Sequence, residues 1–264
     1  MAVITLLTDF GLQDEYVGVL KGVILSNNPK ATIVDISHGI DAHDIVAAAH
    51  ALKSSYGYFQ EGSVHVAIVD PGVGTERAII AARCNRHLFL APDNGLLEPI
   101  LRNGSSTTIH RVENEELFRH PVSRTFHGRD IFAPVAAHLS MGLAIEALGP
   151  SLGIEQVLSL ATGGPRFLGA KELEGRVVAI DRFGNLITNV HCDDMAKLEG
   201  GAMTINIGNH TIEGMVENYA QSGSKSPVAI FGSRGCLEIA ICSGNAARTL
   251  NMAKGDMVRV KVAS

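Results

Sequence analysis

A chain of 264 residues is long enough to bury one large apolar core or two smaller ones. Its 46% hydrophobic and 19% charged residues are typical of globular proteins and exclude a disordered chain. The formal net charge of −5, without any run of basic residues, argues against a nucleic-acid partner, because neutralising phosphates requires clustered Lys and Arg.

Strand-like and helix-like patterns alternate over the first part of the chain. The strands are expected at residues 3–7, 32–36, 63–69, 78–82 and 87–90. The helices are expected at residues 13–28, 44–55, 95–101 and 131–141. Strand–helix–strand units in series predict an α/β N-terminal domain with a mainly parallel central sheet, covered on both faces.

The pattern changes after about residue 165, where short runs with strand periodicity are separated by Gly-Asn and Ser-Gly turns. These strands are expected at residues 176–180, 186–190, 203–207, 211–216, 228–231, 237–241 and 257–262. Such a series predicts a small barrel or sandwich. Residues 150–165 are the best linker candidate, and we place an α/β domain at 1–160 and a β-barrel domain at 161–264.

The four cysteines and the N-terminus bear on the compartment. Cys84, Cys192, Cys236 and Cys242 are widely spaced, which predicts neither disulfides nor a zinc site and favours buried thiols in a reducing environment. The start MAVITLLTDFG lacks the basic residues and long apolar stretch of a signal peptide. No segment reaches the roughly 18 apolar residues of a membrane helix. We expect a cytoplasmic protein with no membrane partner.

Acidic residues follow three of the expected strands. Asp9 follows the first, the segment from Asp35 to His38 the second, and Asp70 the strand at 63–69. Ligands of open parallel sheets tend to lie beyond the carboxyl ends of the strands. Each acid taken alone is more often a turn-former or a helix N-cap.

The segment 70–77, with the sequence DPGVGTER, is more specific. Its glycines and proline predict a tight turn, and Asp70 and Arg77 at its ends are placed to meet as an ion pair. Neither GxxxxGK[ST] nor GxGxxG is present, which argues against a nucleotide-triphosphate site. His127, just before an expected helix, suits proton transfer near neutral pH, although a lone histidine is more often structural. No HxxxH or HExxH spacing predicts a metal site.

Three polar turns interrupt the strands of the second half. They are Asp181-Arg182-Phe183-Gly184-Asn185, Ser233-Arg234-Gly235 and Asn245-Ala246-Ala247. Taken alone, the first two are best explained as hairpin turns, and the third as a turn that leads into a helical stretch.

Taken together, these segments resemble the S-adenosyl-L-methionine hydroxide adenosyltransferase family, the adenosine-forming S-adenosylmethionine hydrolases related to fluorinase and chlorinase. The motifs that carry the resemblance cover nearly the whole chain: LTDFG at Asp9, VDPGVGT at Asp70, APDNGLL at Asp93, TFHGRDIFAP at His127, IDRFGN at Asp181, and GSRGCLEIA followed by GNAA. The resemblance implies a seven-stranded α/β domain joined to a smaller β-barrel. It also implies a homotrimer, with substrate held between the N-terminal domain of one subunit and the C-terminal domain of its neighbour.

The resemblance further assigns roles to individual residues. Asp70, Arg77 and His127 match the family's water-activating set. Gly128 stands where fluorinase has a halide-contacting serine, which disfavours halide use. Asp9 matches the residue that holds the ribose hydroxyls.

The remaining substrate-binding residues lie in the second half. The resemblance implies that Asp181 and Ser233 hold the methionine end and that Asn185 and Ala246 face adenine. Phe183 and Arg234 complete the two substrate loops. The Asp181–Phe183 spacing is one residue shorter than in fluorinase, and the spacing from Ser233 to Ala246 also differs by a few residues.

The expected reaction splits S-adenosyl-L-methionine with water into adenosine and L-methionine. The sulfonium leaves C5′ as a neutral thioether, so neither a general acid nor a metal or other cofactor is needed. Arg77 favours a developing hydroxide, and either Asp70 or His127 accepts the proton. The alternatives are a halogenase and a non-catalytic adenosine- or S-adenosylmethionine-binding protein.

Overall fold

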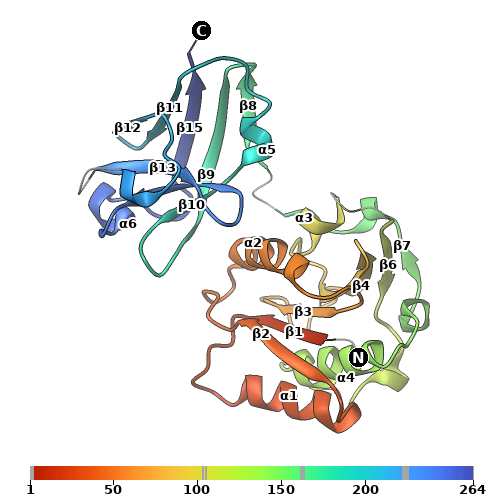
Figure 1. The fold of residues 1–264 in the computed structure, drawn as a ribbon. Helices are drawn as coiled ribbons and strands as arrows, with labels where there is room; N and C mark the ends of the chain where they lie inside the picture. The colour runs from red at the N-terminus through yellow and green to blue at the C-terminus, as the bar shows by residue number, and fades with distance from the viewer. Residues whose placement is uncertain (1–2, 103, 105, 161–163, 222–225, 264) are drawn as a thin grey trace. The chain divides into compact units, whose positions relative to one another are not determined.

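The computed structural model describes residues 3–102, 104, 106–160, 164–221 and 226–263. The chain divides into two compact units, Met1–Thr162 and Gly163–Ser264 (Figure 1). The domain boundary predicted after residue 160 adjoins residues 161–163, which lie outside the described residues. That boundary therefore stays a prediction.

A mixed sheet forms the centre of the N-terminal unit, with the strand order β2-β1-β3-β5-β4-β6-β7. Its strands are β1 (Val3–Thr8), β2 (Thr32–Ser37), β3 (Val64–Ile68), β4 (Ile79–Cys84), β5 (His87–Pro92), β6 (Thr108–Arg111) and β7 (Ser151–Leu152). The pairs β1/β2, β1/β3 and β3/β5 are parallel. β4, β6 and β7 continue the sheet in antiparallel fashion. The predicted α/β class is confirmed, and the antiparallel edge is an addition to it.

Helices cover both faces of this sheet, as predicted (Figure 1). The helices α1 (Tyr16–Asn27) and α4 (Ala133–Ser140) pack on one face, and α2 (Ile45–Ser55) and α3 (Glu98–Leu101) on the other. Asp44 caps α2 by accepting a hydrogen bond from the Ala47 amide. Short helices lie at η1 (Tyr56–Tyr58), η2 (Glu115–Leu117), η3 (Gly128–Phe132), η4 (Ile145–Leu148) and η5 (Ile154–Gln156).

The expected linker, residues 150–165, is largely part of the N-terminal unit. β7 pairs with β6, and the Leu158 amide donates a hydrogen bond to Oδ1 of Asp93 at 2.9 Å. Leu160 is buried against Gly95. The Pro and Gly residues of this stretch suggested a linker, but the apolar residues between them pack on the sheet domain.

An antiparallel barrel forms the C-terminal unit, with the strand order β12-β11-β15-β9-β10-β14-β13 and β8 paired to β9. Its strands are β8 (Arg166–Gly169), β9 (Glu172–Ile180), β10 (Leu186–His191), β11 (Met203–Ile207), β12 (His210–Glu213), β13 (Pro227–Phe231), β14 (Cys236–Ile241) and β15 (Met257–Val262). The short helices are α5 (Cys192–Met195), η6 (Tyr219–Gln221) and α6 (Ala246–Leu250). The end strands β12 and β13 contact each other, so the barrel is nearly closed and the predicted β-barrel class is confirmed.

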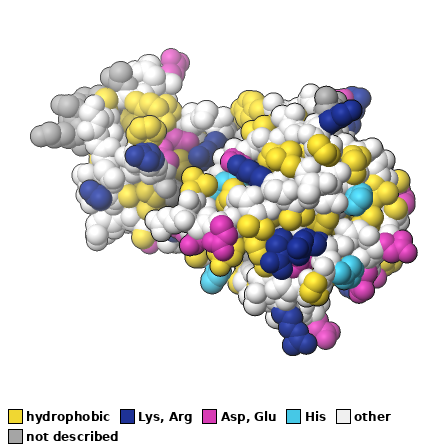
Figure 2. Space-filling model, turned by 90° about the horizontal axis from the view of Figure 1, so that it is seen from below, with side chains coloured by type: hydrophobic (Ala, Val, Ile, Leu, Met, Phe, Trp, Pro, Cys, Tyr) yellow, Lys and Arg dark blue, Asp and Glu magenta, His cyan; other side chains and the backbone are white. Residues whose placement is uncertain are grey.

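The face of the molecule in Figure 2 shows no strip of positive charge among the described residues. On the face shown in Figure 2, Lys and Arg side chains lie in separate small groups among acidic and uncharged ones. Within the described residues, no helix combines the length and the apolar character needed to cross a bilayer. The expectation that nucleic acid is not a partner stays a prediction.

Candidate active-site residues in two cavities

The turn after β3 brings Asp70 and Arg77 together, as the segment 70–77 predicts. The Thr75 hydroxyl donates to the carbonyl of Gly72 at 2.7 Å, and Gly74 has a φ of +78°. Arg77 donates from Nε to Oδ1 of Asp70 at 2.9 Å and from Nη2 to Oδ2. Both side chains are almost completely buried, with exposures of 11% for Arg77 and 6% for Asp70. The result is a bidentate ion pair, which fixes the guanidinium plane.

His127 joins this pair from a distant part of the chain. It precedes η3, a π-helical turn that continues into α4, and such turns are frequent at functional sites. Nη2 of Arg77 lies 3.1 Å from Nδ1 of His127. Because a guanidinium can only donate, Nδ1 is the acceptor and the proton of a neutral imidazole resides on Nε2.

The electrostatics of His127 favour its neutral form. Burial, followed by the charge of Arg77, lowers the pKa of His127 below its ordinary value, against the opposing effects of Asp70 and Asp130. The ring is therefore uncharged at neutral pH and can keep accepting from Arg77.

Asp130 anchors the segment that carries His127. Its carboxylate is fully buried and accepts from Arg129 at 2.7 and 2.8 Å and from the Ser123 amide at 2.8 Å. Arg119 lies 3.5 Å away and its amide donates to the Asp130 carbonyl. The loop before His127 is thus tied to the first turn of the helix after it.

A cavity of about 290 Å³ lies against these residues, with Asp9, Asp70 and His127 all in its lining. The rings of Phe10, Tyr16 and Phe126 form an edge-to-face cluster at centroid distances of 5.1–6.2 Å. The three rings also line the cavity and give it an apolar wall. Arg77 lies behind Asp70 and His127 rather than in the lining.

Asp9 is fixed by backbone contacts at the carboxyl end of β1. Its Oδ2 accepts from the His43 amide at 2.9 Å. His38 supports the same loop, since its Nδ1 lies 2.8 Å from the Thr8 hydroxyl and its carbonyl accepts from the Gly11 amide at 2.8 Å. Of the three acids predicted at strand ends, Asp9 and Asp70 meet at this cavity. Asp35 instead pairs with Lys21 at 2.6 Å and is outside the lining.

In the C-terminal unit, Asp181 organises a tight turn between β9 and β10. Its Oδ1 accepts from the amides of Phe183 and Asn185, both at 2.9 Å, and its Oδ2 accepts from Nδ2 of Asn185 at 2.9 Å. Gly184 has a φ of +87° and lies against Asn245, so a side chain at this position would collide with Asn245. The turn presents the Phe183 ring, which is 74% exposed.

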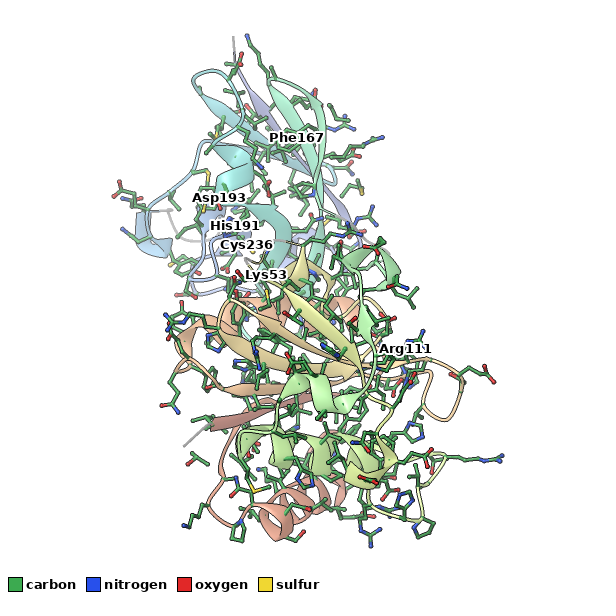
Figure 3. All side chains as sticks on the ribbon, turned by 90° about the vertical axis from the view of Figure 1, so that its right-hand side faces the viewer. Lys53, Arg111, Phe167, His191, Asp193 and Cys236 are labelled. Carbon is green, nitrogen blue, oxygen red and sulfur yellow. The ribbon has the colours of Figure 1, made fainter. Side chains whose placement is uncertain are left out.

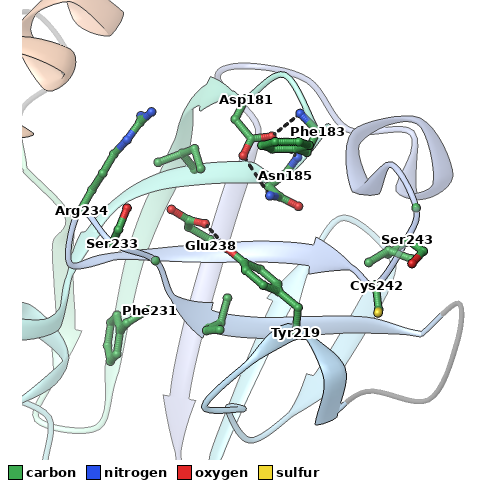
Figure 4. Close-up of a pocket in the computed structure, with 15 residues that line it drawn as sticks. Asp181, Phe183, Asn185, Tyr219, Phe231, Ser233, Arg234, Glu238, Cys242 and Ser243 are labelled. Atoms are coloured by element: carbon green, nitrogen blue, oxygen red, sulfur yellow. Dashed lines mark hydrogen bonds between the residues drawn. The ribbon is translucent and has the colours of Figure 1, made fainter.

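A cavity of about 750 Å³ adjoins this turn (Figure 4). Its lining includes five of the predicted residues: Asp181, Phe183, Asn185, Ser233 and Arg234. Ala246 does not belong to the lining, because it is fully buried in the barrel core at the start of α6. Its side chain therefore faces the core, and only its backbone is left to reach a ligand.

Two further residues of this cavity were not predicted from the sequence. The Tyr219 hydroxyl donates to Oε2 of Glu238 at 3.2 Å, and both residues line the cavity. Burial first, and then the nearby Asp181, raise the pKa of the Glu238 carboxyl. The signal in the sequence was one acid in the middle of a strand whose other residues are all apolar.

A third polar cluster, made of His191, Cys192 and Asp193, lies at the end of β10, where His191 is paired with Cys236 of β14 (Figure 3). Nδ1 of His191 lies 3.5 Å from Sγ of Cys192 and 3.3 Å from Oδ2 of Asp193. The same Nδ1 accepts from the Asp193 amide, which caps α5. Capping explains why these consecutive residues meet, and Asp193 is largely exposed.

The fold and the cavities define a class of protein: an α/β domain with a buried carboxylate–guanidinium–imidazole cluster, in one chain with an antiparallel barrel that carries a polar cavity. The family comparison agrees. Residues 4–149 match the SAM hydroxide adenosyltransferase N-terminal domain, and residues 175–259 match the SAM hydroxide adenosyltransferase C-terminal domain. The chain belongs to the SAM hydroxide adenosyltransferase family.

Individual relatives match over their full length. The chain is 37% identical to an (R)-S-adenosyl-L-methionine hydrolase of Thermus thermophilus, over 96% of this chain and 97% of the relative. It is 33% identical to the enzyme of the same name from Methanocaldococcus jannaschii, over 98% and 95%. A fluorinase of Nocardia brasiliensis is 28% identical, over 98% and 97%. The crystal structure of an uncharacterized conserved protein from Thermotoga maritima superposes with a TM-score of 0.88 at 34% identity, over 98% and 99%.

Proposed function

We propose that the protein hydrolyses (R)-S-adenosyl-L-methionine to adenosine and L-methionine, with Asp70, Arg77 and His127 activating the water. Family membership and full-length relatives named as hydrolases of this substrate support the reaction. The observation that carries the residue assignment is the hydrogen-bonded Asp70–Arg77–His127 cluster at the edge of a cavity.

The reaction needs little from the protein beyond a prepared nucleophile. Water oxygen bonds to C5′ as the C5′–S bond breaks, and the bonding electrons neutralise the sulfonium to give methionine. One proton of the water is lost, so each turnover releases adenosine, methionine and one proton. Holding the water in line with the breaking bond supplies several kcal/mol through orientation.

The hydrogen-bond pattern supports different roles for the three residues of the cluster. Because Nδ1 of His127 accepts from Arg77, His127 offers a donor to the water through its Nε2–H, and the guanidinium adds positive charge. The carboxylate oxygens of Asp70 retain lone pairs beyond those used by Arg77. We assign proton acceptance to Asp70, and to His127 the orientation of the water and the stabilisation of hydroxide.

The substrate contacts divide between the two cavities. Asp9 would hold the ribose hydroxyls in the N-terminal cavity. Asp181 and Ser233 would hold the methionine end, and Asn185 would contact adenine together with the backbone of Ala246. Phe183 and Arg234 complete this set. We further propose a homotrimer in which the N-terminal cavity of one subunit and the C-terminal cavity of a neighbour share one substrate molecule.

The decisive experiment incubates the protein with S-adenosyl-L-methionine in ¹⁸O-water without added metal. The expected result is label in the 5′-hydroxyl of adenosine. Formation of 5′-halo-adenosine in the presence of chloride or fluoride would identify a halogenase, and tight binding without any product would identify a non-catalytic binding protein.

The shared site has its own test. Co-expression of His127→Ala chains with Asp181→Ala chains should restore part of the activity that each variant lacks, since a mixed trimer contains sites with both halves intact. Light scattering gives the mass of the assembly. A monomer with full activity would rule out the proposal of a shared site.

A further inference from the structure

The Glu238 carboxyl occupies an unusual place in the barrel. Glu238 lies in the middle of β14, between Leu237 and Ile239, whose side chains are fully buried in the core. Because side chains alternate along a strand, Glu238 points to the opposite face, which is the cavity side. Its Oε1 lies over Gly232, where a Cβ would collide with it. Space for this carboxyl is therefore built into the turn between β13 and β14.

The carboxyl is buried, and its partners among the described residues carry no positive charge. Glu238 is 5% exposed, and within the described parts of the chain no Lys, Arg or His forms an ion pair with it. Its hydrogen bond comes from the neutral Tyr219 hydroxyl. By contrast, the buried carboxylates of Asp70 and Asp130 both have arginine partners. A buried carboxylate without a counter-charge is costly, so burial shifts Glu238 toward its neutral form and a ligand cation would shift it back.

The charged and titratable groups around Glu238 determine the direction in which the pKa of its carboxyl shifts. Burial is the largest influence, Asp181 adds to it, and both raise the pKa of Glu238. The Tyr219 hydrogen bond and the charge of Arg234 act in the opposite direction. A ligand cation placed beside Glu238 would strengthen that opposite effect and drive the carboxyl to release its proton.

We propose that Glu238 binds the α-ammonium group of the methionine end of the substrate, and that this binding is coupled to release of the Glu238 proton. The inference rests on the proposed function for the identity of the substrate. It adds a specificity residue to the set predicted from the sequence, and it makes Tyr219 the residue that positions its carboxyl.

The surroundings of Glu238 suit a zwitterionic amino acid. Ser233 and Arg234 occupy the turn that leads into β14, and Figure 4 shows the Ser233 hydroxyl on the same side of the cavity as Glu238. A guanidinium and a hydroxyl can take the α-carboxylate, while Glu238 takes the α-ammonium. A primary ammonium offers three donors and suits a carboxylate acceptor better than a sulfonium, which offers none.

The first test is the variant Glu238→Gln, which keeps the shape and removes the charge. The KM for S-adenosyl-L-methionine should rise about ten- to a hundredfold, because a hydrogen bond between charged groups is lost. The kcat should stay close to that of the wild type. Glu199→Gln, which removes an exposed carboxyl from the same domain, is the matched control and should change neither constant.

A second probe separates the ammonium from the sulfonium. The adenosine sulfonium that carries two methyl groups on sulfur has the same charged sulfur and no amino-acid group. Its binding, and that of adenosine, should be unchanged in Glu238→Gln. If the variant weakens all three ligands equally, or leaves the KM for S-adenosyl-L-methionine within twofold of the wild type, the inference is wrong.

Calorimetry in buffers of different ionisation enthalpy tests whether substrate binding releases the Glu238 proton. Wild-type protein should release a proton on binding S-adenosyl-L-methionine, increasingly as the pH falls toward the ordinary range of glutamic acids, and Glu238→Gln should not. Tyr219→Phe should move the release to higher pH, because it removes the hydrogen bond that favours the carboxylate. Binding measured this way does not need turnover. If the protein binds S-adenosyl-L-methionine with proton release but forms no adenosine, the proposed function is wrong and the inference is supported. If the protein turns over the substrate without proton release that depends on Glu238, the inference is wrong and the proposed function is supported.

Discussion

The two units differ in the partners that they provide for a buried carboxyl group. In the N-terminal unit, the Asp70 carboxylate meets Arg77 through two hydrogen bonds, and Arg77 also donates to His127. In the C-terminal unit, Glu238 is also buried, and among the described residues its hydrogen bond comes from the uncharged Tyr219 hydroxyl. The first cluster is complete without a ligand, as a preorganised chemical site should be. In the second, the described partner of the buried Glu238 carboxyl is uncharged, as expected of a site that binds a cationic ligand group. The difference predicts that substitutions in the Asp70–Arg77–His127 cluster change mainly kcat and those in the C-terminal cavity mainly KM.

The largest effect is expected from Arg77→Met, which removes the partner of both Asp70 and His127. The kcat should fall at least about a thousandfold, because the charge that stabilises hydroxide is lost. Stability should fall by about 3–5 kcal/mol, since Asp70 is left buried without its counter-charge. Adenosine formation and thermal unfolding measure the two losses.

The matched control is Arg86→Met, which removes an exposed arginine that pairs with Glu61. It should leave both activity and stability nearly unchanged, because exposed ion pairs contribute little. A wild-type kcat in Arg77→Met would contradict the assignment of this cluster.

The next effect concerns His127. His127→Gln should lower kcat about a hundredfold or more, with a small change in KM. In the wild type, the lowered pKa of His127 keeps it neutral, so kcat should hold through neutral pH and fall only below the ordinary range of histidines. Protonation puts a hydrogen on Nδ1, which can then no longer accept from Arg77.

The pH profile of kcat measures this, and the acidic limb should disappear from the residual activity of His127→Gln. An acidic limb of the same midpoint in that variant would mean that another group titrates.

A smaller effect is expected in how the stability of each unit depends on pH. Burial, with His87 as a lesser cause, lowers the pKa of His65 to about 3, whereas the pKa of Glu238 is raised. The unfolded chain binds more protons at His65 than the folded N-terminal unit does, so that unit loses stability as the pH falls below about 6.5, by about 2 kcal/mol at pH 5. Glu238 works with the opposite sign, because its pKa is higher in the fold than its ordinary value, so that falling pH costs the folded barrel less at this residue.

Hydrogen exchange of peptides from each unit, measured from neutral to mildly acidic pH, separates the two contributions. Protection in the N-terminal sheet should fall faster than protection around β14. Replacing His65 by Gln should flatten the fall in the sheet, and an unchanged slope would show that His65 is not its source.

The sequence was sufficient for the parts that depend on local patterns. The seven strands predicted in the second half are all present, and the helix predicted at residues 44–55 is α2, which begins directly after Asp44. The antiparallel turn between β4 and β5 was not predictable from periodicity. Asn85 and Arg86 both have positive φ, and this turn geometry usually carries an Asn-Gly or Asp-Gly signature that is absent here.

The candidate site was predictable where residues are near in sequence and unpredictable where the fold brings them together. Asp70 and Arg77 end one turn, so their ion pair followed from spacing. The contact of His127 with Arg77 spans 50 residues and came only from the family resemblance. The turn at Asn245 predicts a helical stretch after it, but only the structure shows that α6 buries Ala246 in the core. Glu238 is the single acid in an otherwise apolar strand, but the sequence does not show which face of that strand adjoins a cavity.

The smallest effect is expected from Phe183→Ala in the C-terminal cavity. The ring is 74% exposed and supported by a turn that the Asp181 side chain holds rigidly, so it is available to stack on a flat ligand such as adenine. Removing such a stacking surface costs about 1–3 kcal/mol, so the KM should rise about fivefold or more while kcat stays constant. Phe183→Tyr, which keeps the ring, is the control and should behave like the wild type. A drop in kcat with an unchanged KM would break the division between the two units, because it would make a residue of the barrel part of the chemical step.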